Sequence, residues 1–104
     1  MKILGSYEKQ PDEFIPSGRW GVDFDPDIIS GEAISSATIV VYDKDGTDVT
    51  STLTSGSLTI SGTTVSIAYT GGTAGEVYHA EHKVVTDASG IYEAEVRIYV
   101  FDPP

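Results

Sequence analysis

The residues that most suggest chemistry form an acidic run, Asp23-Phe24-Asp25-Pro26-Asp27, which begins like the calcium loop of an EF-hand. Such a loop needs a glycine at its sixth position and a bidentate glutamate at its twelfth. Those positions hold Ile28 and Ile34, so the spacing excludes an EF-hand. The alternative left open is an irregular calcium site at Asp23, Asp25 and Asp27. A solvated acidic turn is favoured, and no metal site is predicted.

Histidines are the usual general bases and metal ligands, and this chain has two, His79 and His82. An odd offset along a strand sends side chains to opposite faces, so these two histidines cannot bind one metal. His82 is predicted to be a buried histidine with one hydrogen bond, whose partner the sequence does not identify. If it is buried and neutral, stability should fall as the pH drops.

Other catalytic patterns are also missing from the sequence. Glu93 and Glu95 share one face of a predicted strand, but Lys83 and Arg97 lie close enough to make them a charge ladder rather than an acid and base pair. The chain has no Gly-x-Ser-x-Gly elbow and no glycine loop before a helix. We therefore predict no enzyme, no catalytic residue and no cofactor.

The composition of the chain limits the classes of partner that it can bind. The 104 residues include 16 acidic and 6 basic side chains, a net charge of −10, and no cysteine. This charge repels phosphate backbones and anionic membrane surfaces, so neither nucleic acid nor a membrane is an expected partner. The N-terminal residues lack the apolar run of a signal peptide, which predicts synthesis in the bacterial cytoplasm. One domain is expected over residues 1–104.

The elements that must position these side chains are strands. The clearest is a hairpin over residues 75–101, in which Asp87-Ala88-Ser89-Gly90 suits a type I turn closed by a left-handed glycine. Placing Asp87 opposite Ile91 aligns an apolar face against the core. On the other face this register predicts two ion pairs, Lys83 with Glu95 and Glu81 with Arg97. The buried face would hold Tyr78, Ala80, His82 and Val84 against Val100, Ile98, Val96 and Ala94.

Shorter strands account for most of the remaining chain. They are predicted at residues 6–9, 19–24, 36–42, 58–60 and 65–69. At most one helical turn is expected at 25–29, and a glycine turn at 43–47 sets Val49 opposite Val41. Ile60 should pair with Val65 and Leu58 with Ile67. Seven or eight short strands with turns every 8 to 12 residues are typical of a sandwich or a small barrel.

Ala74-Gly75-Glu76-Val77-Tyr78 favours an immunoglobulin-like topology within the sandwich class. A tyrosine that follows a glycine-containing corner, near the start of the penultimate strand, fits the tyrosine corner of that fold. Ala80 would then take the place of the second disulfide cysteine. The alternative is that Tyr78 is only a large apolar side chain at a strand start. We predict an all-β, antiparallel immunoglobulin-like β-sandwich.

Two segments also carry a family resemblance. GEAISSATIVVYDKDGTDVTS and GGTAGEVYHAEHKVVTDASGIYEAEVRIYV resemble a family of small phage and prophage structural proteins, described as phage fiber-tail adaptor proteins. The K-x-P-x-E segment of that family corresponds to Lys9-Gln10-Pro11-Asp12-Glu13, and the likeness extends from about Glu8 to Val100. His82 departs from it, because the family pattern usually has an aliphatic residue there. The resemblance implies a virion-associated structural role, in the tail or head-tail region, without catalysis.

The surface left for a partner lies on the outward side of the closing hairpin. In the predicted register Val77 faces Phe101 and His79 faces Tyr99, and Tyr42 of the third strand should lie near the same end. These five residues are the predicted partner-binding residues, although incidental aromatics or cover by the N-terminal segment are open alternatives. The strand at residues 6–9 is a second candidate, which would pair with a neighbouring subunit's sheet edge.

The predicted function is a non-enzymatic structural or adaptor protein of a phage or prophage virion, whose partners are other virion proteins or further copies of itself. The alternative from another class is a ligand-binding module, carbohydrate-binding or adhesive, in which Trp20 or Tyr42 stacks on a sugar ring. A third possibility is an accessory domain of a longer polypeptide, suggested by the ending Asp102-Pro103-Pro104.

Overall fold

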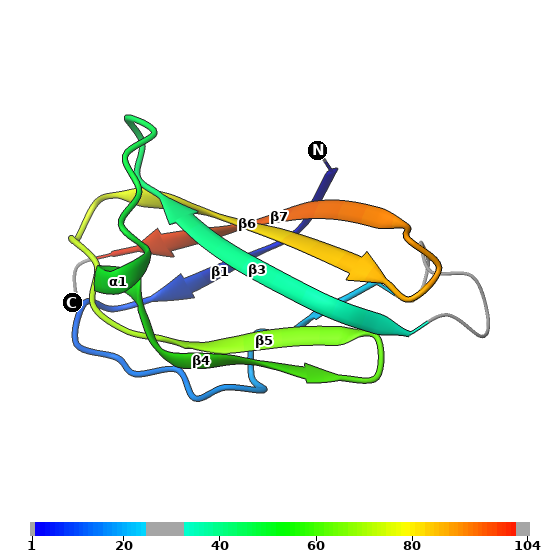
Figure 1. The fold of residues 1–104 in the computed structure, drawn as a ribbon. Helices are drawn as coiled ribbons and strands as arrows, with labels where there is room; N and C mark the ends of the chain where they lie inside the picture. The colour runs from blue at the N-terminus through cyan, green and yellow to red at the C-terminus, as the bar shows by residue number, and fades with distance from the viewer. Residues whose placement is uncertain (1, 25–32, 102–104) are drawn as a thin grey trace.

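The computed structural model describes residues 2–24 and 33–101, which form two packed β-sheets (Figure 1). The elements are β1 (Lys2–Lys9), β2 (Val22–Asp23), β3 (Ile34–Tyr42), α1 (Thr50–Leu53), β4 (Thr54–Ser61), β5 (Thr64–Tyr69), β6 (Val77–Thr86) and β7 (Ile91–Val100). The helical turn predicted at 25–29 and the candidate ligands Asp25 and Asp27 lie outside the described residues. Of the strand predicted at 19–24, only Val22 and Asp23 pair as a strand.

Strand order identifies the topology. One sheet runs β1-β7-β6-β3 and the other runs β2-β5-β4. If β2 to β7 are read as the second to seventh strands of an immunoglobulin domain, these orders match its two sheets, with the first strand placed beside the last. The predicted immunoglobulin-like β-sandwich is confirmed. One detail differs, because β1 and β7 run parallel while the other paired strands are antiparallel.

The core lies between the two sheets. Alternate residues of β6 and β7 point inward, so each strand buries one row of side chains and leaves the other partly or fully exposed. All eight residues that the sequence assigned to the inner face of the hairpin are buried. The facing sheet, the residue after β2 and the short helix α1 contribute Val22, Phe24, Leu53, Val65, Ile67 and Tyr69 to the core.

The register of the long hairpin differs from the prediction by two residues. Val85 lies opposite Ile91, so each β6 residue faces a β7 residue two positions earlier than expected. An even shift keeps every side chain on its face, which is why the buried face was predicted correctly. The two predicted ion pairs are wrong: Lys83 faces Glu93, and Glu81 faces Glu95.

The turn explains this shift. The N–H of Ser89 donates to the carbonyl of Thr86 (3.0 Å), and Ser89, not Gly90, is left-handed (φ 66°). Gly90 pairs with Thr86, and its N–H donates to Thr86 Oγ1 (3.0 Å). A Cβ at position 90 would lie 3.0 Å from that oxygen and from the Tyr92 ring. Glycine fits there because any Cβ would crowd these two side chains, not because the backbone is left-handed.

The other predicted turns hold with one exception. Gly46 is left-handed (φ 83°), and the N–H of Val49 donates to the carbonyl of Val41 (2.8 Å), as predicted. Ile60 pairs with Val65. The expected pairing of Leu58 with Ile67 falls at a bulge, because the β4–β5 register shifts between Ser55 and Thr59.

The tyrosine corner is present. The backbone N–H of Thr73 donates to Tyr78 Oη (2.9 Å), which returns the side chain to the loop five residues upstream. Tyr78 is buried, and Ala80, at the position of the second disulfide cysteine, is fully buried. Tyr78 is therefore more than a large apolar side chain at the start of a strand.

Candidate interaction surface

The five predicted partner-binding residues lie close to one end of the four-stranded sheet, on its outward face. Tyr42 pairs with His79, and Val77 pairs with Tyr99, across neighbouring strands. Phe101 follows directly after β7. Tyr99 and Phe101 are 38% and 41% exposed, and the other three are half-buried. The predicted grouping is present, although its cross-strand partners differ by the two-residue shift.

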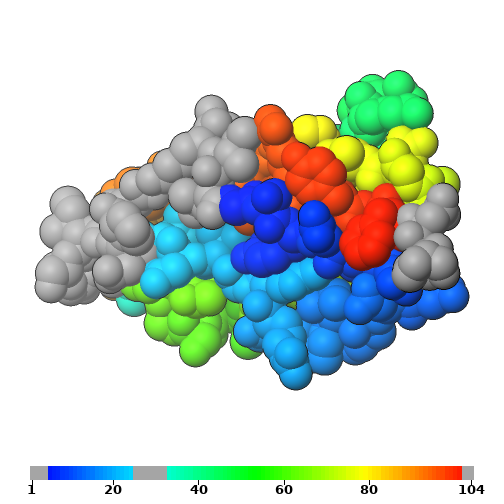
Figure 2. All heavy atoms as spheres, turned by 180° about the vertical axis from the view of Figure 1, so that it is seen from behind, coloured from blue at the N-terminus to red at the C-terminus, as the bar shows by residue number. Residues whose placement is uncertain are grey.

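A shallow hollow opens in this surface. Its lining combines apolar side chains with two acidic ones: Glu8, Gly75, Glu76, Val77, Tyr99, Val100 and Phe101. Figure 2 shows the face on which β7 (orange to red) emerges beside β1 (dark blue). We call the aromatic pair Tyr99 and Phe101, with Val77, Glu8 and Glu76, the acidic-aromatic surface.

The two glutamates of this surface were missed by the sequence analysis. The parallel pairing of β1 with β7 places Glu8 opposite Tyr99. Glu76 is held by the loop before β6, where its carbonyl accepts from the N–H of Val100 (3.0 Å). Its carboxylate also binds Lys44 Nζ (3.1 Å). The strand predicted at residues 6–9 includes Glu8, but the sequence does not show which strand it pairs with.

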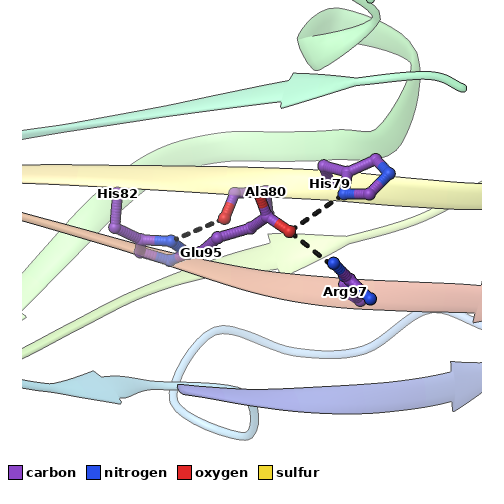
Figure 3. A network of polar contacts seen from close by, with 5 residues as sticks. All are labelled: His79, Ala80, His82, Glu95 and Arg97. Carbon is purple, nitrogen blue, oxygen red and sulfur yellow. Dashed lines mark hydrogen bonds and ion pairs between the residues drawn. The ribbon is translucent and has the colours of Figure 1, made fainter. Parts of the chain in front are cut away.

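A polar network borders the acidic-aromatic surface (Figure 3). Glu95 Oε2 accepts from His79 Nδ1 (2.9 Å) and from Arg97 Nε (3.2 Å). Burial alone would raise the pKa of the Glu95 carboxyl, but the hydrogen bonds and charge interactions with His79 and Arg97 together outweigh burial and lower that pKa. The contacts let Glu95 lie opposite the like-charged Glu81. The network therefore holds the Glu95 carboxylate between two donors, His79 and Arg97, as a structural ion-pair cluster.

Lys9 belongs to a buried anchor that the sequence analysis did not foresee. Its side chain is fully buried, and Nζ donates to the carbonyl oxygens of Gln10 (2.6 Å) and Gly71. Burial lowers the pKa of the Lys9 ammonium, and the carboxylates of Glu13 and Asp12 partly offset this effect. The N–H of Gln10 donates to Glu13 Oε1 (2.7 Å), closing the turn.

This anchor gives the K-x-P-x-E segment a structural role. The lysine of the pattern ties the end of β1 to the loop after β5, and its glutamate closes the turn that follows. The strand itself pairs with the protein's own β7 on one side. Its other side is an edge of the sheet, which leaves the predicted pairing with a neighbouring subunit a prediction.

His82 is buried in the core, as predicted, and is 1% exposed. Its Nδ1 donates to the carbonyl of Ala80 (3.2 Å), the partner that the sequence did not identify (Figure 3). Within the part of the chain that the structure describes, its Nε2 has no hydrogen-bond partner. Burial lowers the pKa of His82 to about 4, against a smaller opposing effect of the Ala80 carbonyl. The side chain is neutral near pH 7.

Trp20, the candidate sugar-stacking residue, is engaged by the protein's own aromatic rings. Its ring stacks on Tyr7 with centroids 4.6 Å apart and an interplanar angle of 8°. A second, tilted contact joins it to Tyr69 at 5.5 Å. Trp20 is half-buried against the core rather than presented to solvent.

The structure gives no support to a metal centre in the residues it describes. No group of three metal-ligating side chains gathers within 2–24 and 33–101. Asp23 Oδ1, the described member of the acidic run, accepts from Thr63 Oγ1 (2.7 Å). Over the same residues, no helix has the length and apolar character that crossing a membrane requires.

Comparisons with known proteins complete these observations. A family model described as "Podophage GP4 fiber-tail adaptor protein gp77" matches residues 9–99. No curated protein sequence matches the chain. Among solved structures, a chain in the crystal structure of the titin M10–obscurin-like 1 Ig complex aligns with a TM-score of 0.47 and 15% identity, covering all of this chain and 93% of the other.

Proposed function

This chain belongs to the podophage GP4 fiber-tail adaptor family, and from that premise we propose that it is a non-enzymatic structural adaptor of a phage or prophage virion. It works through protein-protein contacts in the tail. The family match carries the proposal, and it spans nearly the whole chain, from the Lys9 anchor to Tyr99.

The acidic-aromatic surface is the proposed contact site. Exposed aromatic side chains at the centre of a contact commonly supply most of its binding energy. Here they stand beside the carboxylates of Glu8 and Glu76, the second of which already pairs with Lys44, on a chain whose net charge is −10. A complementary partner surface therefore carries apolar side chains beside arginine or lysine, and its binding should weaken as salt rises.

The test is co-expression with the fiber and tail proteins encoded by the same genome, followed by size-exclusion chromatography with light scattering. The wild-type chain should co-elute with one of them. Tyr99→Ser combined with Phe101→Ser should weaken that complex at least about tenfold, because buried aromatic contacts dominate such interfaces.

A matched control uses apolar side chains exposed elsewhere. Phe14 and Ile91 are 55% and 59% exposed and do not line the hollow. Phe14→Ser combined with Ile91→Ser should leave the complex unchanged. Equal weakening by both double variants would overturn the assignment of the surface. Absence of any complex with the fiber and tail proteins would overturn the adaptor role.

A further inference from the structure

Strand β3 forms an edge of the four-stranded sheet, with β6 on its only paired side. One end of this edge is closed, because the N–H of Val41 donates to Thr50 Oγ1 (2.9 Å) and its carbonyl accepts from Val49 (2.8 Å). Outward backbone groups recur at every second residue of a strand. The N–H and C=O groups of Ala37 and Ile39 therefore also point outward. No described residue hydrogen-bonds with them.

From Ser36 to Tyr42 this edge lacks the devices that usually prevent strand pairing, and the one register shift of β3 lies before that run, between Ile34 and Ser36. Edge strands are commonly protected by charged side chains, proline, bulges or short length. Residues 33–42 contain neither charge nor proline, and the register is regular from Ser36 to Tyr42. By contrast, β1 is charged and bulged, β4 is interrupted between Ser55 and Thr59, and β2 has two residues. Strand β3 is the edge best suited to continue the sheet.

We propose that β3 pairs antiparallel with β3 of a second copy of this chain, which joins two four-stranded sheets into one. Ala37 and Ile39 supply the free backbone groups, since those of Val41 are already bonded. When Ala37 of each copy lies opposite Ile39 of the other, the free backbone groups of both residues form hydrogen bonds on both chains. This register places the two-fold axis at Thr38, which faces its own counterpart.

The lack of charge along this edge permits a second copy as the occupant, whose Ala37 and Ile39 offer the matching free backbone groups. Two chains of charge −10 repel each other, so they can meet closely only where neither is charged. Within the sheet the nearest charged residues are Lys83 and Glu81, which lie on β6 opposite Thr38 and Val40. Beyond the free part of the edge, Asp48 pairs with Tyr42. Across the joined sheet, the two Lys83 residues would be about 14 Å apart, three strand spacings. That exceeds the Debye length of about 8 Å at physiological salt.

Disulfide cross-linking tests the register directly. Because the chain has no cysteine, only the introduced residues can form a disulfide. Residues that face each other in a non-hydrogen-bonded antiparallel pair have Cα atoms about 4.5 Å apart, within the range of a disulfide. Oxidised Thr38→Cys should form dimers. The Val40→Cys variant alone should stay monomeric. A mixture of the Val40→Cys and Ser36→Cys variants should form disulfide-linked dimers. Thr59→Cys, exposed on the edge strand β4, is the control and should stay monomeric.

A charge-swap experiment tests the contact without a covalent bond. The wild-type chain should show mass increasing with concentration in light scattering, and more so at higher salt, because salt screens the repulsion between copies. Thr38→Lys alone and Thr38→Asp alone should each abolish this increase, and their mixture should restore it. Thr59→Lys should behave as wild type.

Two outcomes would overturn the proposal. One is equal cross-linking of Thr38→Cys and Thr59→Cys. The other is self-association of Thr38→Lys at the wild-type level. Tyr99→Ser with Phe101→Ser should leave the self-association unchanged, so this test and that of the adaptor role fail independently.

Discussion

The ammonium of Lys9 donates a hydrogen bond to the carbonyl oxygen of Gly71, 62 residues further along the chain. The contact fastens the first strand of one sheet to the loop that leaves the last strand of the other. It lies inside the protein, because the Lys9 side chain is fully buried. A lysine at the end of a strand usually reaches into solvent, so this position is specialised for holding two distant segments together.

Replacing Lys9 with methionine should destabilise the fold by about 2 to 4 kcal/mol. The substitution keeps the length of the side chain but removes the hydrogen bonds to Gln10 and Gly71, and hydrogen bonds to charged groups contribute roughly 1.5 to 3 kcal/mol each. Urea unfolding measures the change. Lys44→Met, which removes an exposed ion pair with Glu76, is the control and should have little effect. Similar urea midpoints for the Lys9→Met and Lys44→Met variants would show that the buried Lys9 hydrogen bonds do not stabilise the fold.

Two buried tyrosines should respond in opposite directions to loss of their hydroxyls. Tyr78 Oη accepts from Thr73, so Tyr78→Phe should cost about 1 to 2 kcal/mol. Tyr69 Oη is buried without a hydrogen-bond partner among the described residues, so Tyr69→Phe should be neutral or stabilising by about 1 kcal/mol. Thermal unfolding of the two variants under identical conditions measures the direction of each change in stability. A loss of stability in Tyr69→Phe would show that its hydroxyl has a partner.

Stability should fall in acid because of His82. Its pKa is about 4 in the folded protein and near 6.5 when unfolded, so the unfolded chain takes up the proton first as the pH drops. The resulting loss develops between about pH 6.5 and pH 4 and amounts to roughly 3 kcal/mol. His82→Leu should remove this part of the pH dependence, measured by urea unfolding at intervals of half a pH unit. An unchanged slope in the variant would assign the effect to other groups.

The double variant Tyr99→Ser with Phe101→Ser should fold normally. Both side chains are more than one-third exposed, and neither belongs to the buried core cluster. Substitutions at such positions usually change the free energy of unfolding by less than about 0.5 kcal/mol each. Circular dichroism and thermal unfolding check this directly. Loss of folding would mean that these residues support the core, and that their surface role is wrong.

Strand alternation made the sandwich predictable from the sequence, and with it the inner faces of β6 and β7. Tyr78 and its corner were predictable for a similar reason, because a local pattern sets the local structure. The hairpin register was less accessible, since Ser89 took the left-handed position assigned to Gly90. Contacts between distant segments were hardest to foresee. Lys9 and Glu8 acquire their roles only through the parallel pairing of β1 with β7, which leaves no periodic trace in the chain.

That parallel pairing also determines how the protein bears tension. Strands β1 and β7 point the same way, so the start of β1 and the finish of β7 lie at opposite ends of their shared ladder (Figure 1). A pull applied at the two ends of the chain loads this ladder lengthwise, and its hydrogen bonds must shear together instead of opening one after another. At the end of the ladder, where Lys9 lies opposite Val100, the Lys9 side chain also holds β1 to Gly71. Tension along the chain would therefore be resisted by the whole ladder at once.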